Sequence, residues 1–111
     1  MTLGALLDYA LAKPETLETF PFGPDVLVLK TKGKMFLAIA LDTMPLRINA
    51  KCDPEKALAL RETYQGIIPG YHMDKKHWNT IILDGSVSTL LVHELIDHSY
   101  NLVRHPFKKK K

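Results

Sequence analysis

The feature that most constrains the fold is residues 46–51, where apolar and polar side chains alternate strictly. The apolar members are Leu46, Ile48 and Ala50, and the polar members are Arg47, Asn49 and Lys51. Because successive side chains of a β-strand point to opposite faces, this pattern predicts a strand with one buried face and one face in water. A sheet covered on one side only is typical of antiparallel sheets. We therefore expect an antiparallel sheet with helices packed mainly on one face.

Four further segments carry the sequence signals of strands. Residues 26–29 and 35–41 are expected to pair through a hairpin turn at 31–34, which contains Gly33. A short strand is expected within 65–70 and a longer one over 78–83. Together with the alternating segment, these signals predict a sheet of five strands.

Three segments with apolar residues at helical spacing complete the secondary structure. They are residues 3–11, 54–64 and 87–104, with Thr2, Asp53 and Ser86 as the expected N-caps. In the last helix the expected buried stripe is Leu91, Leu95, His98 and Leu102. The order helix, three strands, helix, two strands, helix predicts a two-layer α+β fold, because strands and helices do not alternate one by one.

Length and charge set the domain organisation. A chain of 111 residues with 46% apolar residues suits one hydrophobic core, so we assign 1–105 to a single domain and 106–111 to a basic C-terminal tail. The net charge is +3, but Lys108–Lys111 are all basic, and the preceding 107 residues hold 11 basic and 12 acidic side chains. The folded part is therefore nearly neutral, and the sequence pI near 9.0 is not by itself an argument for nucleic-acid binding.

The sequence also predicts where the protein resides. No segment reaches the roughly 20 apolar residues of a membrane-spanning helix, and the N-terminus lacks the pattern of a signal peptide. The single cysteine, Cys52, cannot form an internal disulfide. We expect a cytoplasmic protein that has no membrane partner, and a monomer is favoured over an oligomer.

The densest polar segment is 71–79, which holds two histidines, two lysines and two large aromatic rings. Lysines can contact phosphates and aromatic rings can stack on bases. The alternative is a turn leading into a strand, with Trp78 buried and Lys75 and Lys76 in water. Because Trp78 and His77 are adjacent in an extended segment, they are expected to point to opposite faces.

A nucleic-acid interface, if present, would combine this segment with the basic residues of segment 30–51, whose charges sum to +4. The candidate contacts are Lys75, Lys76, His77, His72, Lys32, Lys34, Arg47 and Lys51, with Lys30 beside them. Such binding would be electrostatic and would show little sequence preference.

No catalytic residue, metal or cofactor is predicted. His72 and His77 are five residues apart and lack further ligands at zinc spacing. The i, i+4 pairs His93–Asp97 and Glu94–His98 are typical of helix-surface electrostatics, and Cys52 is expected to be a partly buried spectator. An activity near His72 and His77 is kept only as a minor alternative.

Several motifs nevertheless resemble one family along almost the whole chain. They are Pro21-Phe22-Gly23, Gly33-Lys34-Met35-Phe36, Cys52-Asp53-Pro54-Glu55, Pro69-Gly70-Tyr71-His72-Met73, Lys75-Lys76-His77-Trp78-Asn79, Leu83-Asp84-Gly85-Ser86 and Ile96-Asp97-His98-Ser99-Tyr100. In these motifs the chain is similar to the MmcQ/YjbR family. The resemblance implies a fold like that of CyaY and the type III secretion chaperones, with the same element order as above. It also implies the family's usual description as DNA-binding, and it brings no catalytic residue set.

Two functions from different classes follow. The first is weak electrostatic binding of DNA or another polyanion through a basic loop and a sheet face. The second is a non-enzymatic protein-interaction or adaptor module, which a chaperone-like fold would suit because fold alone does not fix function. A continuous basic surface would favour the first, and an exposed apolar patch or a dimer interface would favour the second.

Overall fold

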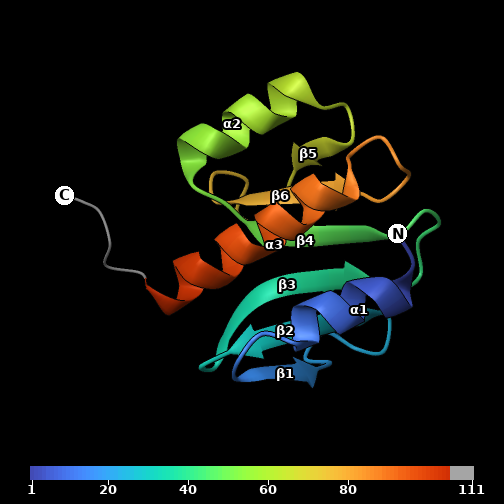
Figure 1. The fold of residues 1–111 in the computed structure, drawn as a ribbon, viewed down its shortest axis with the longest axis vertical. Coiled ribbons are helices and arrows are strands. Elements are labelled where there is room, and N and C mark those ends of the chain that lie inside the picture. Colours follow the sequence, from blue (N-terminus) through green and yellow to red (C-terminus); the bar gives the residue numbers. More distant parts are fainter. Residues whose placement is uncertain (106–111) are drawn as a thin grey trace.

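A six-stranded antiparallel sheet and three helices form the protein (Figure 1). The structure is a computed structural model that describes residues 1–105. The strands are β1 Thr16–Thr19, β2 Val26–Thr31, β3 Lys34–Ala40, β4 Arg47–Lys51, β5 Ile67–Pro69 and β6 Trp78–Ile82, and the helices are α1 Leu3–Leu11, α2 Pro54–Thr63 and α3 Thr89–Arg104. The strand order across the sheet is β1-β2-β3-β4-β6-β5, and every neighbouring pair is antiparallel. The α+β class, the three helices and the antiparallel sheet are confirmed, whereas the predicted basic tail lies outside the described residues.

The prediction of five strands is wrong, because β1 adds a sixth. Only four residues long, β1 pairs with β2 along its whole length at one edge of the sheet. Its Leu17 is 69% exposed, so the strand lacks the alternation of buried and exposed residues that reveals a half-buried strand. The hydrogen bonds to β2 stabilise β1, and no local pattern in residues 16–19 predicts them.

Capping residues fix where the helices begin. The Thr2 hydroxyl accepts a hydrogen bond from the Ala5 N–H at the start of α1, and the Asp53 carboxylate accepts one from the Lys56 N–H at the start of α2. The predicted cap of the last helix is wrong, since Ser88 rather than Ser86 accepts the hydrogen bond, from the Leu91 N–H. Ser86 instead belongs to a turn in which its N–H donates to Asp84.

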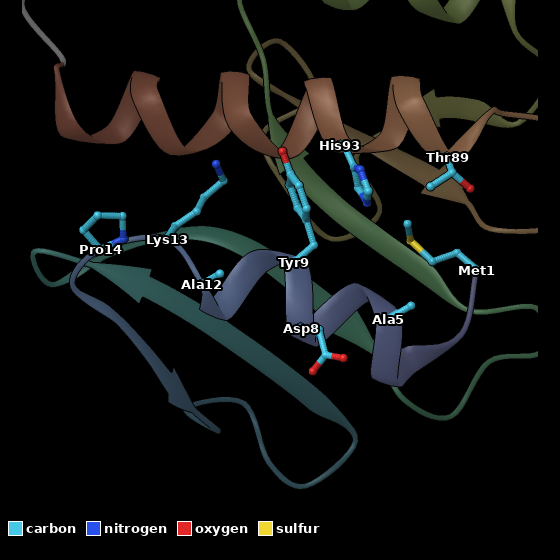
Figure 2. A pocket seen from close by; sticks show the side chains of 9 residues that line it. All are labelled: Met1, Ala5, Asp8, Tyr9, Ala12, Lys13, Pro14, Thr89 and His93. Carbon is cyan, nitrogen blue, oxygen red and sulfur yellow. The ribbon is translucent and has the colours of Figure 1, made fainter.

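Helix α1 packs against α3 through polar as well as apolar groups. In Figure 2, Tyr9 and Lys13 extend from α1 toward α3, and His93 extends from α3 toward α1. The Tyr9 hydroxyl lies 2.7 Å from one carboxylate oxygen of Asp97, which also pairs with Lys13, and the Tyr9 ring stacks on His93 at 3.7 Å. These contacts hold the N-terminal helix to the C-terminal one.

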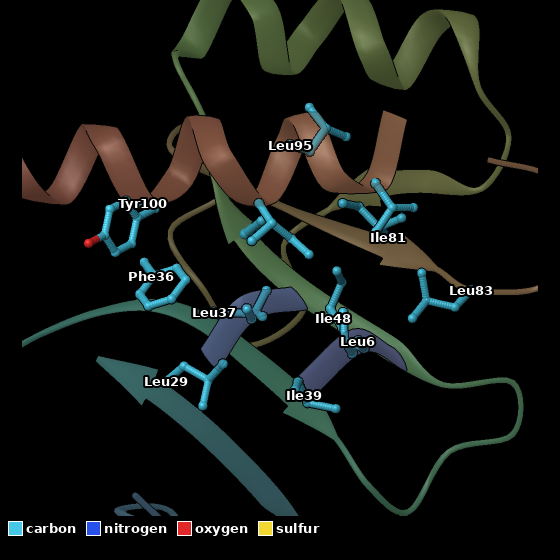
Figure 3. Close-up of a cluster of buried hydrophobic side chains, with 14 of the residues drawn as sticks. Leu6, Leu29, Phe36, Leu37, Ile39, Ile48, Ile81, Leu83, Leu95 and Tyr100 are labelled. Atoms are coloured by element: carbon cyan, nitrogen blue, oxygen red, sulfur yellow. The ribbon is translucent and has the colours of Figure 1, made fainter. Parts of the chain in front are cut away.

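The core lies between the helices and one face of the sheet (Figure 3). Ile48 of β4 is 1% exposed and lies in this core, while its neighbour Arg47 is only half-buried and lies on the other face, as the alternation predicts. In β3 a register shift opposite Leu29 and Lys30 allows Phe36 and Leu37, two consecutive residues, to enter the same core. The ring of Phe36 meets that of Tyr100 edge to face at 5.2 Å.

A serine of α3 replaces backbone pairing where β3 and β4 stop pairing with each other. The Ser99 hydroxyl donates to the Phe36 carbonyl at 2.6 Å and accepts from the Lys51 N–H at 2.9 Å.

The buried stripe of α3 differs from the predicted one. Of the predicted residues Leu91, Leu95, His98 and Leu102, only Leu95 is buried. The buried residues of α3 are Val92, Leu95, Ile96, Ser99, Tyr100 and Val103.

Within residues 1–105, none of the helices combines the length and the apolar character that crossing a lipid bilayer requires.

Candidate nucleic-acid interface

The face of the sheet opposite the core is not covered by the helices. On this face the register aligns Ala38 with Asn49 and Asn49 with Thr80, and aligns Ala40 with Arg47. Polar side chains of β4 thus lie beside the small side chains of β3. We call this surface the open face.

The hairpin between β2 and β3 presents two of the predicted lysines. Lys32 and Gly33 occupy the turn with φ of 53° and 78°, the left-handed region that a two-residue hairpin turn needs. Lys34, the first residue of β3, is exposed, as is Lys32. Both lysines of this hairpin are therefore accessible to a ligand in solvent.

The loop 70–77 presents the other predicted cluster. Lys75 and Lys76 are both exposed, as predicted, but the Lys75 ammonium donates to the Gly70 carbonyl at 2.7 Å. Asp74 accepts from the Lys76 N–H at 2.9 Å and lies 2.6 Å from His77 Nδ1. The hydrogen bond from His77 lowers the pKa of the Asp74 carboxyl, with the Lys76 N–H as a second cause. Lys76 is thus the lysine of this loop whose ammonium makes no hydrogen bond or ion pair within residues 1–105.

An arginine of α2 secures this loop from the helix side. Arg61 Nε donates to the Asn79 side-chain oxygen at 2.6 Å, and its Nη2 donates to the Lys75 carbonyl. Asn79, which is 3% exposed, also donates to the Ala57 carbonyl of α2. Arg61 is therefore a structural cation that fixes the loop, and we do not place it among the candidate ligand contacts.

Trp78 is buried at 9% exposure, which confirms the prediction, but it does not belong to the core under the helices. Ile81 points into that core, so Trp78, three residues earlier in the strand, points to the open face. The loop covers it there, since a Cβ added at Gly70 would lie 2.8 Å from Trp78 Cβ and 2.9 Å from its carbonyl oxygen. Gly70 is required because the loop backbone passes this close to the tryptophan.

A polar network ties the start of the loop to the open face. Asn49 donates to the Tyr71 carbonyl at 3.1 Å, Thr80 Oγ1 accepts from the Tyr71 N–H at 2.9 Å, and the Thr80 hydroxyl donates to Asn49. Tyr71 is 62% exposed, and its ring lies 3.9 Å from that of His72, whose φ is 60°. Strand residues therefore hold an aromatic pair above the sheet.

A groove of about 780 Å³ lies on the open face beside this pair. Its floor includes Ala38 and Ala40, and Arg47 lines it as well. The remaining lining residues are Phe22, Val26, Asp42, Thr43, Asn49, Tyr71, His72, Met73 and Thr80. Small side chains on β3 leave the space that larger residues would fill.

The strand register gathers most of the predicted basic residues at one end of the sheet, which we call the lysine end. Its members are Lys30, Lys32, Lys34, Lys51, Lys75 and Lys76. The acidic residues that flank the strands at the opposite end are Asp25, Asp42 and Asp84. At the lysine end, by contrast, Glu15 pairs with Arg104, Asp74 with His77, and Asp53 caps α2.

Three predicted contacts are not members of the lysine end. Arg47 is four residues from Lys51 on β4, about 13 Å along the strand, and lines the groove instead. His72 also lines the groove, while His77 is half-buried against Asp74. The single interface expected from the sequence is thus two adjoining regions, the lysine end and the groove.

The other candidate sites serve the fold. His98 Nε2 accepts from the Asp53 N–H at 3.1 Å, and burial lowers the pKa of this histidine. Burial raises the pKa of the Cys52 thiol to about 11. Burial and the hydrogen bond to Asp97 raise the pKa of Tyr9 to about 12.

A second hollow of about 750 Å³ lies between α1 and α3 (Figure 2), but its polar groups Tyr9 and Lys13 already bind Asp97. Among the residues that the structure describes, no group of three His, Cys, Asp or Glu side chains is placed to hold a metal ion.

Sequence reasoning missed the groove, although part of its signal is visible in the sequence. The alternation of large residues with Ala38 and Ala40 in β3 indicates a shallow second face. The contribution of Phe22 could not be read, because it lies in the turn-rich segment between β1 and β2, far in sequence from the groove residues of β4 and the loop 70–77.

Comparisons with known proteins place the chain in a family. The model of the family described as YjbR matches residues 11–102. The chain belongs to the YjbR family. YbdF of Escherichia coli O157:H7 is 43% identical over 95 residues, covering 85% of this chain and 77% of YbdF. YjbR of Escherichia coli K12 is 30% identical over 100 residues, covering 90% and 85%. YyaQ of Bacillus subtilis is 40% identical over 85 residues, covering 67% and 71%.

Solved structures extend the YjbR-family likeness to three dimensions. The Deinococcus radiodurans protein DR2400 has a TM-score of 0.89 at 39% identity, over 99% of this chain and 83% of the other. A Pseudomonas syringae protein has a TM-score of 0.79 at 29% identity, over 92% and 98%. The likeness to DR2400 thus spans the sheet and the helices that cover it.

Proposed function

We propose that this YjbR-family protein binds single-stranded nucleic acid weakly, through phosphate contacts at the lysine end and along the open face. The observation that carries the proposal is the strand register, which brings lysines from the hairpin, from β4 and from the loop 70–77 to the same end of the sheet. Lysine contacts to phosphates supply affinity without reading the bases.

Two exposed aromatic rings beside the open face favour a single strand over a duplex as the ligand. Tyr71 and Phe22, which lie in loops that border the groove, are 62% and 65% exposed, and exposed rings can stack on unpaired bases. A duplex keeps its bases stacked on one another, so these rings would contribute little to binding it. Preference among base sequences is expected to be small, because stacking tolerates every base.

The test is a fluorescence anisotropy titration of a labelled oligothymidylate and of a duplex of the same length, over a series of salt concentrations. For a single strand, the logarithm of the affinity is expected to fall with the logarithm of the salt concentration by about 0.7 per phosphate contact. A full-length variant in which Lys108–Lys111 are replaced with serine separates the charge of the tail from that of the sheet. Absence of binding to either nucleic acid at low salt, with the lysines of the tail intact, would refute the proposal.

The matched variants are Lys76→Gln at the lysine end and Lys56→Gln on α2, both of which remove one exposed charge. Lys76→Gln is expected to weaken binding and to reduce the salt slope by about 0.7, while Lys56→Gln, on the helix side of the same end of the sheet, is expected to have a clearly smaller effect on both. Equal effects of the two variants would show that the protein attracts the polyanion by net charge alone.

A further inference from the structure

The groove on the open face is lined by charged, polar and aromatic side chains that do not belong to the lysine end. Arg47 is half-buried at its side and takes part in none of the ion pairs or side-chain hydrogen bonds found within residues 1–105. An arginine placed in this way retains its planar set of N–H donors, which matches a carboxylate or a phosphate.

Some of the other polar groups of the groove are already hydrogen-bonded within the protein, and others are not. Asn49 and Thr80 are occupied with each other and with the Tyr71 backbone, so they shape the groove without being free to bind. Asp42 also lines the groove, is exposed, and makes no ion pair with Arg47. The groove therefore offers a cation for an anionic group and, separately, a carboxylate for N–H or O–H donors.

The apolar parts of the groove suit a flat ring. Ala38 and Ala40 provide a low floor, and the exposed rings of Phe22 and Tyr71 belong to its lining. The volume of about 780 Å³ lies within the range of about 300–1,000 Å³ found for small-molecule sites.

We propose that this groove binds a small ligand that combines a planar ring, hydrogen-bond donors and one phosphate or carboxylate. Arg47 holds the anionic group, Asp42 accepts from the donors, and Phe22 and Tyr71 pack against the ring. This site goes beyond the proposed nucleic-acid binding, because it depends on Arg47 and the floor of the groove rather than on the lysine end, although the rings of Phe22 and Tyr71 would serve both.

Amide chemical shifts of the ¹⁵N-labelled full chain test the proposal with four probes: adenosine monophosphate, adenosine, indole-3-acetate and inorganic phosphate. Saturable shifts at Ala38, Ala40, Asn49 and Tyr71 are expected with adenosine monophosphate or indole-3-acetate, each of which combines a planar ring, an N–H donor and an anionic group. Adenosine, which has the ring and the donors but no anion, and phosphate, which has no ring, are each expected to bind at least about tenfold more weakly.

Two variants and one control sharpen this test. Arg47→Gln removes the cation and Ala40→Leu fills the floor without changing charge, and each is expected to weaken binding of the best probe at least about tenfold. Lys51→Gln, on the same strand and face but at the lysine end, is expected to leave it unchanged. Absence of saturable shifts with all four probes would overturn the proposal, as would binding that survives both Arg47→Gln and Ala40→Leu.

The two proposals can fail separately. Weaker oligothymidylate binding in Lys76→Gln with unchanged probe binding would support both, since the phosphate contacts would then depend on the lysine end and probe binding would not. Oligothymidylate binding without any probe binding would leave the lysine end as a ligand site and remove the groove.

Discussion

Ile48 and Arg47 are neighbours on β4, yet they lie in two regions of the molecule that are built differently. Ile48 is 1% exposed among the large aliphatic side chains under the helices, while Arg47 lies half-buried in a groove whose floor includes two alanines. The covered face stabilises the fold through close packing of large apolar groups. The open face has the opposite character, with small residues on β3 and polar residues on β4, and it keeps space and charge available.

This difference indicates which side chains can change without loss of the fold. On the covered face, even small changes in volume affect stability. On the open face, the polar network of Asn49 and Thr80 and the close contact of Gly70 with Trp78 fix the loop 70–77, while Lys76 and Arg47 have no partner within residues 1–105. Stability and ligand contacts are thus assigned to different residues of the same strands.

The largest effect is expected from the covered face. Ile48→Ala should lower the free energy of unfolding by about 4 kcal/mol, because it removes a fully buried side chain on a central strand. Arg47→Ala on the adjacent position should lower it by less than about 1 kcal/mol. Urea denaturation of both variants measures the contrast, and equal losses would contradict the assignment of the two faces.

Trp78→Ala should lower the free energy of unfolding by about 3 kcal/mol, less than Ile48→Ala, because only the loop 70–77 covers the ring. Gly70→Ala should also be destabilising, since its Cβ would meet the backbone of Trp78 at 2.9 Å. A urea midpoint for Trp78→Ala equal to that of the parent would mean that the ring does not anchor the loop.

Ser99→Ala should lower the free energy of unfolding by about 1.5 kcal/mol, because it leaves the Phe36 carbonyl and the Lys51 N–H without their partner between β3 and β4. Ser86→Ala, an exposed serine, is the control and should have an effect below about 0.5 kcal/mol. Hydrogen exchange at the Lys51 amide should accelerate in Ser99→Ala alone. Unchanged exchange would show that the hydroxyl is not the acceptor.

His98 predicts a pH dependence with a definite sign. Burial lowers its pKa in the folded state, so the unfolded chain binds a proton more readily than the folded protein does. Stability is therefore complete above the unfolded pKa of about 6.5 and declines as the pH falls from there toward the lower folded pKa. The urea midpoint of the parent should fall more between about pH 7.5 and about pH 5.5 than that of His98→Gln. Equal falls would contradict the prediction.

The smallest stability effect is expected at the lysine end. Lys76→Ala should change the free energy of unfolding by at most about 0.5 kcal/mol, because its exposed side chain has no partner within residues 1–105. Its oligothymidylate affinity should nevertheless fall. A large loss of stability together with unchanged affinity would reverse the roles given to the two faces.

Local patterns in the sequence were sufficient for most of the fold. The alternation of residues 46–51, the hairpin turn at Gly33 and the caps at Thr2 and Asp53 each depend on a few neighbouring residues, and each is found as expected. The strand β1 could not be read because its stability comes from pairing with β2. The stripe of α3 was displaced because Ser99, a polar residue, is buried for its hydrogen bonds to β3 and β4.

The candidate site was predictable only as a set of residue types. The lysines were identified, but the sequence could not show that the register separates Arg47 from Lys51, or that the Lys75 ammonium binds the Gly70 carbonyl. The groove depends on contacts between the segment after β1, the centre of β3 and the loop 70–77. Such contacts between distant segments become visible only in the folded structure.

The open face and the lysine end are proposed to bind a polyanion, while the covered face supports the fold. The most direct measurement is the map of amide chemical-shift changes when ¹⁵N-labelled protein is titrated with oligothymidylate, using the variant in which Lys108–Lys111 are replaced with serine. The predicted result is a set of saturable shifts at Lys32, Lys34, Lys51, Tyr71 and Lys76, with the outward-facing amides of α1 and α3 unchanged. Shifts centred on α1 and α3, or no saturable shifts at low salt, would contradict it.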